Sequence, residues 1–302
     1  ACMSLTTHRS RPFSSSQRLP EPEQPPVLHE PEEAGALLAE FIQRHPRLLI
    51  LTGAGVSTDS GIPDYRDGDG AWKRKQPVQH KAFMEDVYTR QRYWGRSLIG
   101  WPVMRNARPN PSHHYISDLE LLNHSSLVVT QNVDRLHQKA GTRGVTDLHG
   151  RADQVVCMSC GYRCPRDEVH DRCADLNPGF QKYTAETAPD GDADLDVDFE
   201  DFRLADCPKC EGILKPDVVF FGDYVPKDRV YSALDTLKAS DGLLVIGSSL
   251  MVYSGFRFCR YANEWNKPIA TLNLGRTRAE DLVDLKLNAR IGETLKASLD
   301  QL

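Results

Sequence analysis

The fold is decided by the stretch LLILTGAGVS at residues 48–57. Residues 48–52 are apolar or β-branched without alternation, which is typical of a strand buried on both faces of a parallel sheet. Gly53 and Gly55 follow directly. Glycines at this point let the backbone approach a phosphate beside the unpaired N–H groups of a helix N-terminus. The next glycine is Gly61, so the run departs from the usual dinucleotide-binding fingerprint, and a tight structural turn stays open as the alternative.

Comparable apolar runs recur along the chain, with helical patterns between them. The runs lie at 127–130, 218–221, 243–247 and 269–274. Residues 34–42 carry apolar side chains at i, i+3, i+4 and i+7 spacing, which predicts one face of an amphipathic helix, and 228–239 is a second helical stretch. Strands that alternate with helices predict an α/β fold with a Rossmann-like, doubly wound parallel sheet.

The central part of the chain interrupts this alternation and holds most of the cysteines, so we expect a second, smaller domain inserted into the first. The predicted division is 1–31 as a leader and linker, 32–150 with 215–302 as the Rossmann-like larger domain, and 151–214 as the smaller domain, with an acidic insertion at 183–202.

The first twenty residues are basic and rich in serine. Arg9, Arg11 and Arg18 lie there and no acid precedes Glu21, a composition that resembles a mitochondrial transit peptide. An accidental composition in a disordered tail is the alternative. The expected location is the mitochondrial matrix.

Composition and charge exclude several classes of protein. The 302 residues carry 37 Lys+Arg against 42 Asp+Glu, a formal net charge of −5 that argues against a general polyanion binder. No run of about eighteen apolar residues occurs, so no transmembrane helix is expected. We expect neither a nucleic-acid nor a membrane partner, and a monomer is compatible with the sequence.

Six of the eight cysteines fall between residues 157 and 210, and four of them form two C-x-x-C pairs, Cys157 with Cys160 and Cys207 with Cys210. Four thiolates at this spacing suit a closed tetrahedral zinc site, which has no open position for water and is therefore structural, with one ion per chain. Residues 161–206 separate the pairs, a longer stretch than the about 15–20 residues typical of a ribbon, and a redox-active pair is the alternative.

Further motifs follow one another along the chain. They are GIPDYR at 61–66, TQNVD at 130–134, LHG at 148–150, the two C-x-x-C pairs, KPDVVFFGD at 215–223, GSSL at 247–250 and NLG at 273–275. Together with the glycine turn, this set resembles the sirtuins, NAD-dependent protein-lysine deacylases, over about residues 35–300, and their mitochondrial sirtuin-4 type most closely. The resemblance implies NAD and structural zinc as cofactors. It also implies acyl-lysine proteins as substrates, mitochondrial metabolic enzymes among them.

The resemblance also implies the catalytic chemistry. In sirtuins the acyl-lysine carbonyl oxygen attacks the nicotinamide ribose as nicotinamide leaves, and a histidine, which maps to His149, then acts as general base on a ribose hydroxyl. An unperturbed imidazole is largely neutral at the alkaline pH of a mitochondrial matrix and can accept this proton. Asn132 and Asp134 map to the nicotinamide region and Gln131 to the ribose. A buried structural histidine is the alternative for His149.

The implied NAD site draws on distant parts of the chain. Tyr65 replaces a phenylalanine common in sirtuins and is expected to shield the reactive centre from water, Asp64 and Arg66 fit a cofactor-binding loop, and Ile291 maps to an adenine contact. The expected cofactor-binding residues are Gly53, Ala54, Gly55, Ser57, Thr58, Asp64, Tyr65, Arg66, Gln131, Asn132, Val133, Asp134, Gly247, Ser248, Ser249, Asn273, Leu274, Gly275 and Ile291.

Two segments are expected to hold the substrate as an added strand. By resemblance they are Val219, Phe220, Phe221 and Gly222 on one side and Met251, Val252 and Tyr253 on the other. Ser254 stands where proline is frequent, which predicts looser docking and poor deacetylation.

Tyr93 and Arg96 lie one helical turn apart. They resemble the pair by which a desuccinylating sirtuin holds an acidic acyl group, and a guanidinium with a phenol can bind a carboxylate. A solvated helix surface is the alternative.

An acidic run lies between Tyr183 and Phe202. It contains Glu186, Asp190, Asp192, Asp194, Asp196, Asp198, Glu200 and Asp201, with no Lys or Arg. A solvated loop is one interpretation. The other is that Leu195, Val197 and Phe199 anchor the insertion against the catalytic domain near the active-site channel.

Other functions remain open at this stage. ADP-ribose transfer to a protein nucleophile would use the same first step, a sirtuin fold could sense NAD as a non-catalytic scaffold, and the nucleotide fold alone would also suit a hydride-transferring dehydrogenase.

Overall fold

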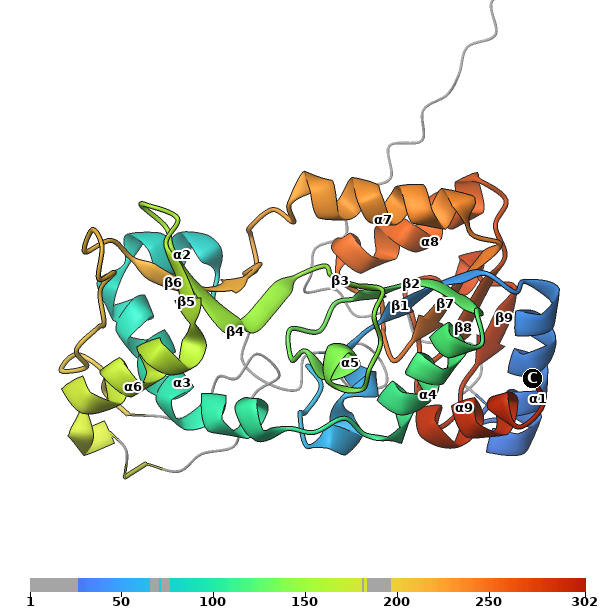
Figure 1. Cartoon of the computed structure of the whole chain (residues 1–302), viewed down its shortest axis with the longest axis horizontal. Coiled ribbons are helices and arrows are strands. Elements are labelled where there is room, and N and C mark those ends of the chain that lie inside the picture. The colour runs from blue at the N-terminus through green and yellow to red at the C-terminus, as the bar shows by residue number, and fades with distance from the viewer. Residues whose placement is uncertain (1–26, 66–70, 72–76, 181, 184–196) are drawn as a thin grey trace, which may run out of the picture.

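The computed structural model describes residues 27–65, 71, 77–180, 182–183 and 197–302. In it a larger body built on a parallel sheet lies beside a smaller body around the cysteines (Figure 1). The basic leader, Arg66 and Leu195 fall outside the described residues. Among the described helices, none has the length and apolar character that crossing a bilayer requires.

The larger body contains a six-stranded parallel sheet, the type of sheet that the sequence predicts. The apolar run at 218–221 is not part of it, because the chain there follows a strand, Leu214–Val218, that pairs antiparallel in the smaller body. The strands of the parallel sheet are β1 (Leu48–Thr52), β2 (Ser125–Thr130), β3 (Val145–Asp147), β7 (Gly242–Ile246), β8 (Ile269–Leu272) and β9 (Leu285–Leu287). They lie in the order β3-β2-β1-β7-β8-β9, and every pair is parallel. All residues of β1 are buried because it pairs on both sides and is covered on both faces. The strand order reverses at β1, and such a point in an open α/β sheet creates a ligand-binding crevice beyond the carboxyl ends.

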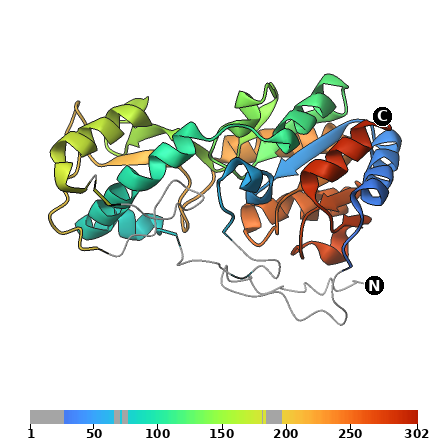
Figure 2. The same ribbon diagram turned by 90° about the horizontal axis from the view of Figure 1, so that it is seen from below.

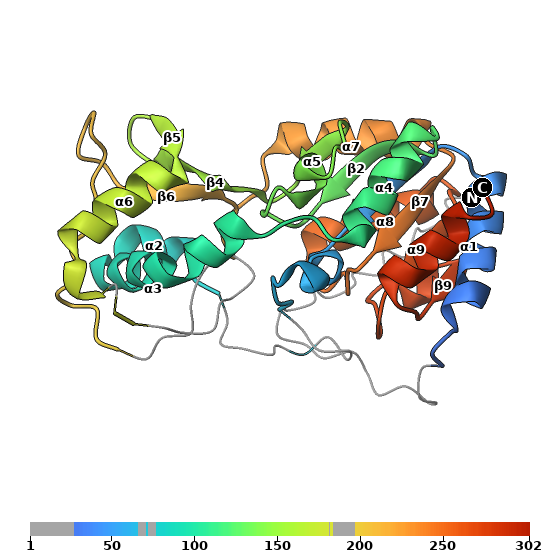
Figure 3. The same ribbon diagram turned by 60° about the horizontal axis from the view of Figure 1, so that its bottom comes forward.

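Helices cover both faces of this sheet (Figures 1 and 3). One face carries α1 (Pro31–Arg44), α4 (Pro111–Leu121) and α9 (Ile291–Leu299), and the other carries α7 (Lys227–Ala239) and α8 (Tyr253–Glu264). The amphipathic face predicted for residues 34–42 is buried on the sheet. The helix α1, near the start of the chain, packs against α9, near its end. Shorter elements of the chain are η1 (Ala54–Val56), η2 (Thr58–Ser60), α5 (Leu136–Lys139), η3 (Pro178–Phe180) and η4 (Glu280–Leu282).

The smaller body combines an antiparallel sheet with helices that pack beside it (Figure 2). Its strands, in the order β5-β4-β6, are β4 (Gly150–Cys157), β5 (Arg163–Pro165) and β6 (Leu214–Val218), and its helices are α2 (His80–Glu85), α3 (Val87–Asn106) and α6 (Arg166–Leu176). Phe83, Trp94 and Leu98 share one apolar core with residues of the cysteine segment. Residues 80–106 therefore pack with the smaller body, although the predicted division places them in the larger one.

The end of the acidic insertion is anchored by aromatic side chains. Phe199 and Phe202 are each 1% exposed. The ring of Phe199 stacks on Phe180 and lies against Gly95 of α3, where a Cβ atom would come within 2.5 Å of it. The anchoring predicted for Phe199 is thus present, but its ring packs on α3 of the smaller body, because only a glycine leaves room for it there.

We predict that Phe199→Ala lowers the free energy of unfolding by about 3–5 kcal/mol, since it removes a buried aromatic ring and leaves a cavity over Gly95. Urea denaturation checks this. Tyr231→Ala is the control, because Tyr231 is 59% exposed on α7 and its loss should cost little. Equal unfolding midpoints for Phe199→Ala and the unmutated protein would contradict the anchor.

Candidate functional site

A cavity of about 700 Å³ opens at the carboxyl edge of the parallel sheet. It is lined by the turns that follow β1, β2, β7 and β8 and by the segment after β6. The predicted site residues found in its wall are Gly53, Ala54, Gly55, Ser57, Thr58, Asp64, Tyr65, residues 131–134, His149, residues 219–222, 247–249, 251–253 and 273–275, and Ile291. The fold therefore gathers nearly all of the predicted cofactor and substrate residues around one space.

The cavity wall also contains residues that sequence reasoning did not assign to the site. They are Ile62, Val218, Asp223, Tyr224, Val225, Leu250 and Arg257, and Ser254 of the predicted substrate segment lines the cavity as well. Most of them adjoin a predicted residue in the sequence, so widening each motif by a residue or two would have found them. Arg257 lies one helical turn beyond the GSSLMVYS stretch, and no spacing rule pointed to it.

The glycine turn after β1 lies directly against the turn after β7. The N–H of Gly53 donates to Ile246 O at 3.1 Å, and the N–H of Gly55 donates to Gly247 O at 2.9 Å. A Cβ atom on Gly53 would come within 2.7 Å of Gly247 O, and Gly247 itself has a φ of +63°. The glycines are needed because two backbones meet here, so the structural-turn interpretation holds alongside any role in ligand binding.

The turn after β7 fits an anionic group. Within the described part of the chain, the backbone N–H groups of Ser248 and Ser249 have no acceptor. Successive N–H groups of this kind form a site for phosphate oxygens. The donor set therefore suits the pyrophosphate of NAD, which the resemblance places beside these residues.

A buried hydrogen-bond network joins the turns after β1 and β2. Ser57 donates to Asp134 Oδ2 at 2.7 Å, and the side-chain amide of Asn132 donates to Ser57 Oγ and to Gly53 O, each at 3.0 Å. The N–H of Leu136 donates to Asp134 Oδ1. Burial raises the pKa of Asp134. Asn132 and Asp134 thus hold the walls of the cavity in place, and contact with nicotinamide is a further role that we propose for them.

Two histidines lie behind this network, and the sequence analysis did not identify them. His113 Nε2 lies 3.3 Å from Ser57 Oγ, His137 Nε2 lies 2.8 Å from Thr52 Oγ1, and their ring centroids are 5.0 Å apart. Burial lowers the pKa of His113 to about 3 and that of His137 to about 4, so both are uncharged at neutral pH. His113 is distant from the network in the sequence, so no local motif could reveal it, whereas His137 lies three residues beyond Asp134 and a wider reading of the TQNVD motif would have found it.

His149 lies in the cavity wall with both ring nitrogens engaged. Its Nδ1 lies 3.0 Å from Gln131 O, and its Nε2 lies 2.7 Å from Ser254 Oγ. A carbonyl oxygen only accepts, so the proton belongs on Nδ1 and the lone pair on Nε2. Burial, with smaller effects of Arg257 and Arg229, lowers the pKa of His149 to about 4. The imidazole is therefore an uncharged proton acceptor at neutral pH.

The segment after β6 is tied to His149 and to α2. The N–H of Val219 donates to His149 O at 2.8 Å, and the N–H of His80 donates to Phe221 O at 2.8 Å. Phe220 lines the cavity and packs on the rings of Phe83 and Tyr93. The segment predicted to pair with substrate is thus held against His149 by both bodies.

Tyr93 and Arg96 are not among the cavity-lining residues. Tyr93 is 2% exposed, and its hydroxyl lies 3.4 Å from the guanidinium of Arg166. Arg166 is fully buried against the rings of Tyr93, Trp94 and Trp101 and donates to Ser97 Oγ at 2.5 Å. The one-turn spacing is present on α3, but it places Tyr93 in the core behind Phe220.

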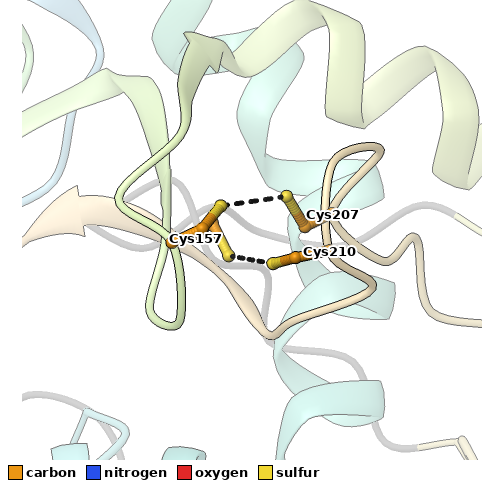
Figure 4. Close-up of side chains that lie close together, drawn as sticks. Cys157, Cys207 and Cys210 are labelled. Atoms are coloured by element: carbon orange, nitrogen blue, oxygen red, sulfur yellow. Dashed lines mark hydrogen bonds between the residues drawn. The ribbon is translucent and has the colours of Figure 1, made fainter.

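The four predicted zinc ligands of the smaller body lie together (Figure 4). Cys157 Sγ is 3.5 Å from Cys210 Sγ, and Cys160 Sγ is 3.8 Å from Cys207 Sγ. Sulfur atoms around a tetrahedral zinc ion, with Zn–S distances of about 2.3 Å, lie about 3.8 Å apart. The four thiols therefore fit one zinc ion that cross-links the ends of β4 and β6, with no position left for catalysis.

Comparison with known proteins places the chain in a family. The Sir2 family is matched by residues 53–254, and the chain belongs to that family. An NAD-dependent protein deacetylase of Xanthomonas campestris is 56% identical over 264 residues, which cover 87% of this chain and 90% of the relative. The NAD-dependent protein deacylase Sirt4 of Drosophila melanogaster is 42% identical over 302 residues, 98% and 96% of the two chains.

Solved structures agree with this assignment. A structure described as Sir2 bound to acetylated peptide has a TM-score of 0.70, and one of Sir2 with a p53 peptide and NAD⁺ has a TM-score of 0.69. Each is 26% identical and covers 88% of this chain and 97% of its own. The predicted sirtuin resemblance is confirmed, and with it an NAD-dependent enzyme of the protein deacylase and deacetylase class with a zinc-binding module.

Ser254 contacts His149, the expected general base, and we predict that Ser254→Ala lowers kcat about tenfold and leaves KM for NAD unchanged. When Nε2 takes a proton, the hydroxyl can turn and accept from it, and such charge-assisted hydrogen bonds contribute about 1.5–3 kcal/mol. Steady-state kinetics with an acyl peptide measure both constants. Ser254→Thr should restore kcat, Ser232→Ala on α7 is the control, and an unchanged kcat in Ser254→Ala would contradict the role.

Proposed function

We propose that this protein is a mitochondrial protein-lysine deacylase that prefers acyl groups larger than acetyl, of the dicarboxyl, branched or lipoyl type. Nicotinamide and O-acyl-ADP-ribose would be its co-products, and its substrates would be proteins of the mitochondrial matrix. The observation that carries the proposal is the uncharged His149, whose Nε2 lone pair lies in the same cavity as the glycine turn and the two substrate segments.

Each group of residues has a task in this reaction. NAD supplies, when bound, a ribose carbon from which nicotinamide can leave. The turns after β1, β7 and β8 would bind its phosphates and adenosine, and Asn132 with Asp134 would border the nicotinamide. Tyr65 lines the cavity, where it would exclude water from the reacting carbon. His149 would take the proton of a ribose hydroxyl at Nε2, while Gln131 O holds the Nδ1 proton.

Support for the substrate range and the location comes from the relatives. The fly protein, which matches nearly the whole chain, is named a deacylase, and several bacterial relatives of higher identity are named deacetylases. Acetyl-lysine is therefore a necessary member of any substrate panel. The basic, serine-rich leader supports a mitochondrial location.

We propose that Tyr93 and Arg96 could bind an acidic acyl group only if the side chains around them rearranged.

The experiment is an acyl-peptide panel with NAD, read by mass spectrometry. We expect loss of acyl mass from peptide with one nicotinamide released for each acyl group removed, and faster turnover of dicarboxyl, branched or lipoyl peptides than of acetyl peptide. His149→Tyr should lower turnover at least about 100-fold, because it removes the general base. His124→Tyr, at a histidine outside the cavity wall, is the matched control.

The contrary outcomes are distinct from one another. Addition of ADP-ribose mass to a protein without acyl loss would indicate an ADP-ribosyltransferase. NAD binding without any product would indicate a non-catalytic sensor, and fastest turnover of acetyl peptide would contradict the proposed acyl preference alone.

A further inference from the structure

We infer that Arg257 and Arg260 form a receptor for the carboxylate of an acidic residue next to the acyl-lysine in the protein substrate. The inference rests on the proposed function and names the class of peptide that the site selects. Both arginines belong to α8, whose first residues border the cavity.

The two arginines flank one exposed tyrosine. The guanidinium carbon of Arg257 lies 5.3 Å from the centre of the Tyr253 ring, and that of Arg260 lies 6.0 Å from it. Arg260 also donates to the Tyr253 hydroxyl at 3.2 Å. Tyr253 is 47% exposed and ends the segment expected to pair with a substrate strand. A peptide strand on that segment would therefore pass beside both guanidinium groups.

Arg257 has no anionic partner among the described residues. Its Nε is buried without a hydrogen-bond partner, and among the described residues its guanidinium makes neither a hydrogen bond nor an ion pair. Arg257 nevertheless lines the cavity. A half-buried guanidinium whose N–H groups lack acceptors costs free energy. A carboxylate that accepts two parallel hydrogen bonds would supply these acceptors.

Three kinds of anion could bind at Arg257 and Arg260, and the position of the two arginines favours one of them. NAD phosphates have the turn after β7, where the N–H groups of Ser248 and Ser249 lack acceptors within the described part of the chain. An acidic acyl group would enter the cavity and would not reach Arg260, which is exposed and absent from the cavity wall. Only a peptide side chain at the cavity mouth can lie beside both arginines. Tyr224, 90% exposed and also part of the cavity wall, adds an apolar surface for such a peptide.

The test compares three peptides that share one backbone. The first carries an acyl-lysine with glutamate at the flanking positions, the second carries the same acyl-lysine with glutamine there, and the third carries a glutaryl-lysine with glutamine flanks. For the unmutated protein we expect KM for the first peptide to be about tenfold below that for the second, as one charge-assisted pair implies. Fluorescence anisotropy of labelled peptides without NAD should give the same ratio in Kd.

Variants test whether the two arginines cause this difference in KM between the glutamate and glutamine peptides. Arg257→Gln and Arg260→Gln should each reduce the ratio of KM between the glutamine and glutamate peptides, and Arg257→Glu should reverse it in favour of peptides with lysine flanks. Arg44→Gln is the matched control, because Arg44 is an exposed arginine on α1, which contributes no residue to the cavity wall.

Several results would overturn the inference. They are equal KM and Kd for glutamate and glutamine peptides in the unmutated protein, a loss in Arg257→Gln confined to the glutaryl peptide, and a rise in KM for NAD in that variant. If no peptide is deacylated, the proposed function fails, while the anisotropy ratio still decides whether the acidic peptide binds at these arginines.

Discussion

The hydroxyl of Ser57 fixes the geometry on which the site depends. Ser57 is 1% exposed, donates to Asp134 and accepts from Asn132, so the turns after β1 and β2 have one relative position. Asn132 also reaches the carbonyl of Gly53, whose own N–H is bonded to the end of β7. Three strand ends are thereby linked around a single buried side chain. Hydrogen bonds within the protein thus fix the wall of the cavity in which NAD is expected to bind.

The buried polar groups around this link are held in uncharged or hydrogen-bonded states. His113 and His137 stay neutral because burial lowers their pKa values, and the Asp134 carboxyl has two hydrogen-bond donors. The same physical effect acts on His149, where neutrality serves chemistry because it keeps a lone pair available. Desolvation therefore keeps His113 and His137 uncharged beside the network, and it keeps His149 in the uncharged form that the proposed general base requires.

The sequence alone predicted the parts of the molecule whose signals are local. The unbroken apolar run at 48–52 predicted a central strand, the glycines after it predicted a turn at the cavity, and the two C-x-x-C pairs predicted a four-sulfur cluster; all three are present. What it could not predict depends on pairs of residues far apart in the chain. The helix α3 joins the smaller body because Gly95 accepts Phe199, and Tyr93 is buried because Arg166 lies over its ring. The hydroxyl of Ser254 contacts His149, and no spacing rule in the sequence predicts this contact.

The central claim is that the fold presents His149 as an uncharged base with its lone pair on Nε2. The most direct measurement is a pH titration of the protein with ¹⁵N-labelled histidine, followed by NMR and assigned with His149→Tyr. The account predicts that His149 stays neutral from pH 8 to pH 5, as a pKa of about 4 requires, with its proton on Nδ1 throughout. A titration midpoint near the ordinary histidine value of about 6.5, or a proton on Nε2, would contradict it.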